Sequence, residues 1–172
     1  QAEHDASSQS VLITDSGALA DAVADAAERQ LATLARSDIA RRSWDTHGAI
    51  ILVANLRDAA PLVDRVAPEH LELAVSAPDA LAEKITHAGA IFLGRHTPEA
   101  IGDSVAGPNH VLPTARSARF SSGLGVTDFM KRTTLVSCDA DSLARIGPAA
   151  VTLAGAEGLD AHALSLSVRL DD

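Results

Sequence analysis

The stretch RVAPEHLELA, residues 65–74, joins a helix-like segment, a rigid bend and a strand-like segment. The residues after His70 alternate in polarity, which is typical of a strand. Proline fixes its own φ angle and disfavours the helical conformation in the residue that precedes it. We therefore expect a helix to end near Val66, with Glu69 and His70 displayed at the bend that Pro68 imposes.

The same alternation of helix-like and strand-like segments extends on both sides of this bend. Short apolar segments predict strands: SVLIT at 10–14, AIILVA at 49–54, LELAV at 71–75 and AIFLG at 90–94. Helix-like segments fall between them: from a Ser16 cap to about Arg36, over 38–44, from an Asn55 cap to Val66, and from Ser76 or Asp79 to about His87. The pattern predicts a parallel α/β sheet, with functional residues at the carboxyl ends of its strands.

The last part of the chain has a different character. We predict a last strand over residues 127–139, TDFMKRTTLVSCD, and two helices over residues 140–170. Gly147 and Pro148 are expected to interrupt the first of these helices. We therefore predict an α/β domain over residues 1–123 and a small, mainly helical appendage over residues 124–172.

The composition argues against several classes of partner. The net charge is −9, and neither nucleic acid nor an anionic membrane surface attracts an acidic protein. The longest apolar runs are of strand length, far too short to span a bilayer. A single cysteine, Cys138, excludes an internal disulfide and fits a reducing compartment, and we predict that it lies buried in a strand. With no signal peptide in the polar N-terminus, we expect a cytoplasmic protein.

Several polar residues have the chemistry of metal ligands. Gln1 and His4 are three residues apart, so both would face one way on a helical turn. Asp103 lies seven residues before His110, in a predicted loop rich in glycine and proline, and Glu157 and His162 bracket the start of the last helix. Two interpretations remain open on residue chemistry alone. Mixed nitrogen and oxygen ligands could bind zinc or a similar divalent ion, or these side chains could be unconnected caps and loop hydrogen-bonding groups; the candidate ligands are Gln1, His4, Asp103 and His162.

The bend itself also has two interpretations. An imidazole titrates near neutral pH, so His70 could take a proton from a substrate hydroxyl, while the Glu69 carboxylate could activate water. Alternatively, Glu69 and His70 simply cap the element that follows them.

Six segments of the chain resemble histidinol dehydrogenase, and they occur in the order found in that family. The segments are QAEH (1–4), VAPEHLEL (66–73), AGAIFLG (88–94), TPEAIGDSVAGPNHVLPT (97–114), ARFSSGLGVTDFMKR (118–132) and EGLDAH (157–162). The resemblance implies an incomplete Rossmann-like parallel sheet with flanking helices and a C-terminal helical appendage that contacts a second subunit. It also implies NAD-dependent oxidation of L-histidinol to L-histidine through L-histidinal, the last steps of histidine biosynthesis, with zinc bound.

The resemblance also implies roles for individual residues. His70 would be the base that takes the hydroxyl proton, and Glu69 would activate the water that hydrates the aldehyde. His110 and Glu157 would line the substrate pocket, with Glu157 suited to the substrate's ammonium group. Zinc would be held by Gln1, His4, Asp103 and His162, the last of these supplied across the interface of an intertwined homodimer. The substrate-binding set would be Gln1, His4, His70, Asp103, His110, Glu157 and His162.

The chain departs from the family pattern in two ways. Ser104 and Thr127 stand where an aromatic residue is usual, which affects local packing or pocket shape. The chain also corresponds only to the C-terminal portion of the family's enzymes and has no glycine-rich dinucleotide fingerprint. We therefore expect it to be inactive alone, with its NAD-contacting residues unassigned. The alternatives are a related zinc-dependent dehydrogenase of another primary alcohol, or a non-catalytic domain that binds zinc or an imidazole ligand.

Overall fold

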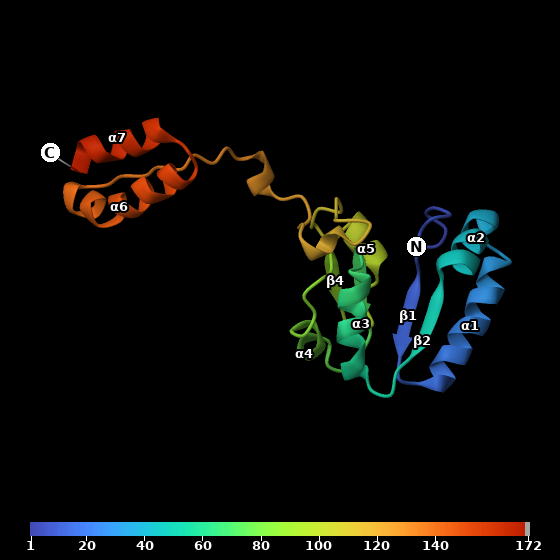
Figure 1. Ribbon diagram of the computed structural model, residues 1–172. Coiled ribbons are helices and arrows are strands. Elements are labelled where there is room, and N and C mark those ends of the chain that lie inside the picture. Colours follow the sequence, from blue (N-terminus) through green and yellow to red (C-terminus); the bar gives the residue numbers. More distant parts are fainter. Residues whose placement is uncertain (171–172) are drawn as a thin grey trace. The chain divides into compact units, whose positions relative to one another are not determined.

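The computed structural model describes residues 1–170. The chain divides into two compact units, Gln1–Asp128 and Phe129–Asp172. The first unit combines short parallel strands with flanking helices, and the second is a pair of helices (Figure 1). The predicted incomplete α/β fold is therefore confirmed.

The first unit begins with one parallel strand pair and two helices. Strand β1 (Val11–Thr14) pairs with β2 (Ala49–Leu52), in a register that sets Val11 opposite Ala49 and Thr14 opposite Leu52. Helices α1 (Gly17–Leu31) and α2 (Ser37–His47) connect the two strands. The Ser16 hydroxyl accepts the N–H of Leu19 over 3.2 Å, so the predicted N-cap is confirmed. Helix α1 ends at Leu31, earlier than the predicted end near Arg36.

The second parallel pair follows in the same unit. The 3-10 helix η1 (Leu56–Asp58), which Asn55 caps, leads into α3 (Ala59–Val66). Strand β3 (His70–Leu73) pairs with β4 (Ala90–Leu93), and α4 (Pro78–Ala82) lies between them in the chain. Helix α5 (Glu99–Ser104) and the 3-10 helices η2 (Ser117–Arg119) and η3 (Val126–Phe129) complete this part. The strands form two separate two-stranded sheets among the described residues, where the sequence had predicted one sheet.

The bend before β3 has a defined geometry. Helix α3 ends at Val66, and its C-cap residue Ala67 has left-handed backbone angles (φ 48°, ψ 63°) and donates its N–H to the Val63 carbonyl over 2.7 Å. Pro68 follows and disfavours the right-handed helical conformation at Ala67. The carbonyl of Glu69 then accepts the N–H of Ala90 over 2.8 Å, which starts the β3–β4 ladder. The predicted helix end and bend are thus confirmed, and the strand begins at His70.

The second unit is a helical hairpin. Helix α6 (Ala140–Ala156) begins at an Asp139 cap, and α7 (Asp160–Leu170) packs against it. The predicted interruption at Gly147 and Pro148 is wrong, because α6 continues through both residues. Gly147 has no Cβ to clash with the proline ring, which removes part of the usual conflict. A Cβ on Gly147 would also lie 3.0 Å from the Leu170 side chain, so this glycine allows the two helices to approach closely.

The predicted last strand is wrong. Residues 130–139 have no helix or strand, and Leu135 and Val136 are 91% and 85% exposed. Cys138 is exposed as well, so the prediction of a buried cysteine is also wrong. A strand needs a neighbouring strand to satisfy its backbone groups, and none of the described segments offers this stretch one. Among the described residues, no helix is long and apolar enough to cross a membrane.

Candidate active site

Three polar side chains from two elements meet over the β3–β4 pair. The Nε2 atom of His70, the first residue of β3, lies 3.7 Å from Oε1 of Glu99 and 3.8 Å from Oδ1 of Asp103. Both carboxylates belong to α5. We call these residues, His70, Glu99 and Asp103, the His70 cluster. Within residues 1–170 they form the one group of three or more histidine, cysteine and acidic residues close enough to hold a metal ion.

The position of α5 brings the two carboxylates to His70. Glu99 and Asp103 are four residues apart, so they share one face of the helix. Gly102 lies against the Phe92 ring, and a Cβ at Gly102 would overlap that ring. The ring centroids of Phe92 and His70 are 6.0 Å apart. The glycine therefore lets α5 approach β4 closely enough to present its acids to His70.

A second contact fixes the start of α5. The backbone N–H of Glu99 donates to a carboxylate oxygen of Glu72 over 2.7 Å. Glu72 lies two residues after His70, so both side chains project from the same face of β3. Helix α5 thus lies over one face of this strand pair. The cluster gathers at His70, which is the amino end of β3, so the expectation of a site at the strand carboxyl ends is wrong for this cluster.

The imidazole of His70 is buried without a partner. Its side chain is 14% exposed, and neither Nδ1 nor Nε2 has a hydrogen-bond partner within the described residues. Buried polar atoms in folded proteins are nearly always hydrogen-bonded, because desolvation without compensation costs about 1–3 kcal/mol. Glu99 is 25% exposed and Asp103 is 41% exposed, so the cluster opens to solvent on the side of the acids. The arrangement is suited to a bound ligand that hydrogen-bonds the ring.

The carboxyl group of Glu99 is electrostatically unusual. Burial raises its pKa above the ordinary value, and the neighbouring Asp103 carboxylate raises it further. A positive charge on His70 opposes this shift. Chemically, the His70 cluster offers an imidazole that can accept a proton, and two carboxylates that can orient the imidazole or bind a cation.

A family comparison accounts for the sequence as a whole. The profile described as "Histidinol dehydrogenase" matches residues 1–170. The chain belongs to the histidinol dehydrogenase family. It is 69% identical over 172 residues to the histidinol dehydrogenase of Rhodospirillum rubrum, and 64% identical over 171 residues to that of Nitrobacter winogradskyi. Each alignment covers 99% of this chain and 40% of the relative.

Structural comparison gives the same family. The crystal structure of histidinol dehydrogenase from Elizabethkingia anophelis superposes with a TM-score of 0.83 at 35% sequence identity. The match covers 99% of this chain and 39% of that structure. The chain therefore spans about 40% of the length of the curated relatives it matches.

The N-terminal residues predicted from the family resemblance lie outside the His70 cluster. Gln1 and His4 share one turn, in which the backbone N–H of His4 donates to the Gln1 carbonyl over 3.0 Å. Both residues are exposed, and Arg36 donates to the His4 carbonyl over 3.2 Å. The side chains of Gln1 and His4 are thus left free of hydrogen bonds to the other described residues.

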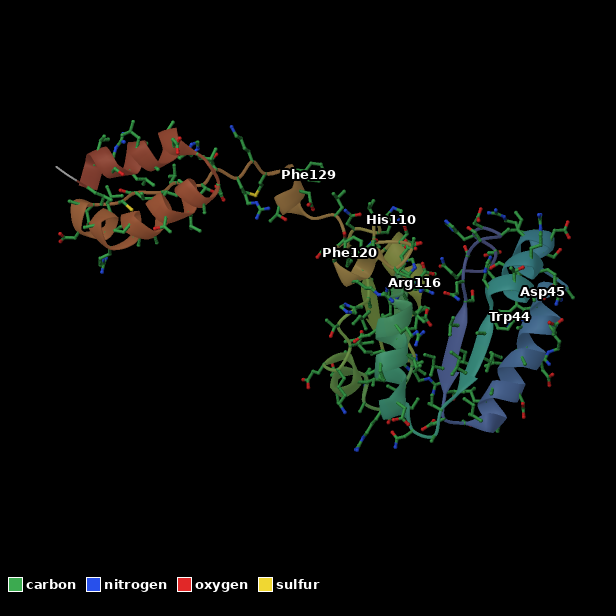
Figure 2. All side chains as sticks on the ribbon, viewed as in Figure 1. Trp44, Asp45, His110, Arg116, Phe120 and Phe129 are labelled. Carbon is green, nitrogen blue, oxygen red and sulfur yellow. The ribbon has the colours of Figure 1, made fainter. Side chains whose placement is uncertain are left out.

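Other predicted residues lie close to the cluster in sequence. Glu69 is half-buried and immediately precedes His70, and its backbone carbonyl is tied to Ala90. His110 lies on the exposed loop after α5 (Figure 2). His70 is part of a strand and its ring nitrogens are unpaired, so the alternative in which it caps a following element is wrong.

The last two predicted residues belong to the second unit. Glu157 is the C-cap of α6, and His162 is in the first turn of α7, where its N–H bonds to the Leu159 carbonyl over 3.0 Å. Both side chains are exposed. Their roles remain predictions.

The structure thus brings together two of the predicted residues, His70 and Asp103, and adds a third. Sequence reasoning missed Glu99. The available signal was its position four residues before Asp103 in PEAIGDS, a spacing that puts two acids on one face if the segment is helical.

Proposed function

We propose that this chain is the C-terminal portion of a zinc- and NAD-dependent histidinol dehydrogenase that oxidises L-histidinol to L-histidine through L-histidinal. The observation that carries the proposal is the buried, unpartnered His70 ring, held beside two carboxylates in a chain of this family. The high identity to relatives named histidinol dehydrogenase supports the substrate. We place the reaction in the cytoplasm, in accordance with the single cysteine.

In this proposal His70 takes the proton of the substrate hydroxyl as hydride leaves the carbinol carbon. An imidazole with an open nitrogen lone pair and no competing hydrogen bond is ready to do so near neutral pH. NAD supplies hydride acceptance when it is bound.

Glu69 acts in the second oxidation. Its carboxylate takes a proton from water as the water oxygen bonds to the aldehyde carbon, and the former carbonyl oxygen takes up the proton that His70 gained in the first oxidation, which gives the hydrated aldehyde. Loss of a hydride from that hydrate to a second NAD, with a hydroxyl proton passing to His70, yields the carboxylic acid. The backbone of Glu69 is fixed by the bend and by the Ala90 hydrogen bond, which supports a constant direction for its side chain.

The residues of this chain fit a zinc ion. Gln1 and His4 share one exposed turn, and the Asp103 carboxylate is partly open to solvent. Together with His162 of a second copy, they give two imidazoles, an amide oxygen and a carboxylate, a mixed donor set that zinc accepts. Zinc would hold the amine and imidazole nitrogens of the substrate and so orient the carbinol carbon. His110 and Glu157 would line the same pocket, with Glu157 facing the ammonium group.

We further propose that residues 124–172 form a dimer-contact domain, beside an α/β domain over residues 1–123. Apolar side chains on the helical hairpin and on the segment before it are exposed, and a second subunit would cover them; they are Leu135, Val136, Ile146, Leu153, Leu164 and Val168. A homodimer of this kind would allow His162 to reach the site of the partner.

The test uses the complete gene product, incubated with L-histidinol and NAD. Formation of NADH and L-histidine is expected, together with retained zinc after dialysis that rises when L-histidinol is present. The proposal fails if NAD is reduced only with other primary alcohols, or if zinc and imidazole ligands bind without any redox turnover.

A further inference from the structure

We propose that Asn109 is a positioning residue for His110, because its carboxamide fixes the backbone on both sides of that histidine. The inference deepens the proposed function and rests on it for the role of His110 in the substrate pocket. It concerns the segment over residues 109–124, which follows α5 and contains η2. The His110 side chain makes no hydrogen bond to the other described residues, so its direction depends on the backbone that carries it.

The carboxamide of Asn109 makes two hydrogen bonds. Its Oδ1 atom accepts the N–H of Val111 over 2.7 Å, which closes an Asx turn around His110. Its Nδ2 atom donates to the Leu124 carbonyl over 3.0 Å. The N–H of Leu124 donates in turn to the Val111 carbonyl over 2.9 Å, so the two ends of the segment are tied together. Asparagine is the one side chain of this length that offers both an acceptor and an NH2 donor.

The same segment packs beside the His70 cluster. Pro113 is buried, and a Cβ on Gly89 would lie 3.1 Å from the Pro113 ring and 2.6 Å from the Glu69 carbonyl. Pro113 therefore lies at the amino ends of β3 and β4, next to the residue that precedes His70. The backbone that carries His110 is thus anchored three residues away, at the end of the strand pair where the proposed base lies.

Two further contacts fix the rest of the segment. Arg119 donates to the Arg65 carbonyl in the last turn of α3, the helix that leads into the bend before β3. A Cβ on Gly123 would lie 2.9 Å from the Leu112 side chain, so this glycine lets the returning chain pack closely on the outgoing chain. These contacts hold the path of the segment as a whole, whereas the Asx turn sets the local direction of His110.

The chain offers a matched control for this motif. It contains two asparagines, Asn55 and Asn109. The Oδ1 atom of Asn55 accepts the N–H of Arg57 over 2.9 Å, which closes an Asx turn of the same kind at the start of η1. Within residues 1–170 the Asn55 carboxamide has no second hydrogen bond, and its turn contains no residue of the candidate site. Asn55→Ala therefore removes the same local motif away from His110.

The kinetic test compares Asn109→Ala, Asn109→Asp and Asn55→Ala in the complete gene product at saturating NAD. Asn109→Ala loses both hydrogen bonds, and we expect KM for L-histidinol to rise about 10-fold with kcat within about threefold of the parent, because a misdirected His110 binds substrate less well. Asn109→Asp keeps the acceptor for Val111 and loses the donor to Leu124, so its KM should lie between those of Asn109→Ala and the parent. Asn55→Ala should match the parent, and zinc content should be the same in all four proteins.

A double-mutant cycle decides whether Asn109 acts through His110. Asn109→Ala is made in the parent and in His110→Ala, and kcat/KM is measured in each background. If Asn109 acts by directing His110, its substitution should lower kcat/KM about 10-fold in the parent and less than about twofold in His110→Ala. A general loss of structure would lower kcat/KM by the same factor in both backgrounds, and that result would overturn the inference. An Asn109→Ala variant with the kcat/KM of the parent would overturn it as well.

A further measurement is independent of turnover. Hydrogen exchange of the Val111 and Leu124 amides reports how firmly the backbone around His110 is held. Exchange at both amides should be faster in Asn109→Ala than in the parent and unchanged in Asn55→Ala. Equal protection in Asn109→Ala and the parent would overturn the inference.

These measurements separate the two levels of the argument. If the parent protein does not oxidise L-histidinol, the proposed function fails, and the inference about its substrate pocket falls with it. If the parent is active and the double-mutant cycle is additive, the inference alone fails. Loss of zinc from Asn109→Ala in parallel with kcat/KM would show that Asn109 acts on the metal site, and would also overturn the inference alone.

Discussion

The two parallel strand pairs of the first unit share a backbone plan and differ in chemistry. The residue before each first strand, Ser10 or Glu69, accepts an N–H from the first residue of the paired strand, over 3.0 Å and 2.8 Å respectively. Each first strand then begins one residue later, with Val11 in β1 and His70 in β3. At equivalent backbone positions, β1 therefore has the apolar Val11 and β3 has His70, the proposed base.

The glycine before the second strand extends this correspondence. A Cβ on Gly48 would lie 2.5 Å from the Trp44 side chain, and one on Gly89 would lie 2.6 Å from the Glu69 carbonyl. The close approach is to the preceding helix α2 in the first pair and to the residue before β3 in the second pair. What distinguishes the β3–β4 pair is α5, whose acids lie over the strand face beside His70. The comparison teaches that the two strand pairs share a scaffold, and that the chemistry of the second pair comes from His70 at the start of β3 together with the acids of α5.

The strongest way to break this comparison is to remove the base. His70→Ala in the complete gene product is expected to lower kcat by about 10²- to 10⁴-fold, the usual contribution of a general base. Zinc content, measured by elemental analysis, should stay the same. Val11→Ala, the substitution at the equivalent position of β1, should leave kcat within a factor of two or so of the parent. If His70→Ala loses zinc together with activity, His70 is a structural or metal-binding residue instead.

Asp103→Asn tests whether Asp103 of α5 binds zinc, a function that Glu99 on the same helix does not share in this proposal. Replacement of a charged ligand by a neutral amide should release most of the zinc on dialysis and should abolish turnover. The control is Asp45→Asn on α2, where an exposed ion pair with Arg41 over 3.8 Å contributes little. Full zinc retention by the Asp103 variant would show that the metal is held without this carboxylate.

Gly102→Ala tests how far stability depends on the close approach of α5 to β4. The new Cβ would overlap the Phe92 ring, so α5 must shift, and we expect a loss of about 1–3 kcal/mol in the free energy of unfolding. Gly17, at the start of α1 beside the other strand pair, has open space, and Gly17→Ala should stabilise by about 0.4–1 kcal/mol. Denaturant titration measures both values. Equal effects of the two substitutions would contradict a packed contact between α5 and β4.

The smallest expected effect is a pH dependence of stability in the zinc-free protein. The pKa of Glu99 is raised in the folded state, so the folded chain binds more protons than the unfolded chain between the ordinary glutamate pKa and the raised one. The contribution of Glu99 to stability is therefore fully present below the ordinary pKa and is lost as the pH rises through the raised pKa. Glu99→Gln should remove this part of the pH dependence of the free energy of unfolding. An unchanged pH dependence in the variant would assign the effect to a group other than Glu99.

The sequence predicted those parts of the fold that depend on local physics. The strands within 10–14, 49–54, 71–75 and 90–94 were recognisable because their apolar runs are short and bounded by caps and turns. The Ser16 cap and the bend at Pro68 followed from side-chain and ring geometry alone. Predictions were wrong where the outcome depended on contacts with other residues that the local sequence pattern does not contain. The run around Leu135 has strand-like residues but no neighbouring strand among the described segments. Helix α6 continues through Pro148, where the preceding glycine removes part of the steric conflict.

The candidate site divides in the same way. By itself, the sequence determined the family and the bend that displays His70, because these are carried by residue identity and short-range backbone preference. The sequence had placed Asp103 in a loop, and that prediction is wrong because the structure places it in helix α5. Only the tertiary structure decided that Glu99 is part of the site. Its carboxylate matters because Gly102 lets α5 pack against Phe92 and because Glu72 holds the start of that helix over β3. Contacts between residues about 30 positions apart depend on how the elements pack, which a local sequence pattern does not contain.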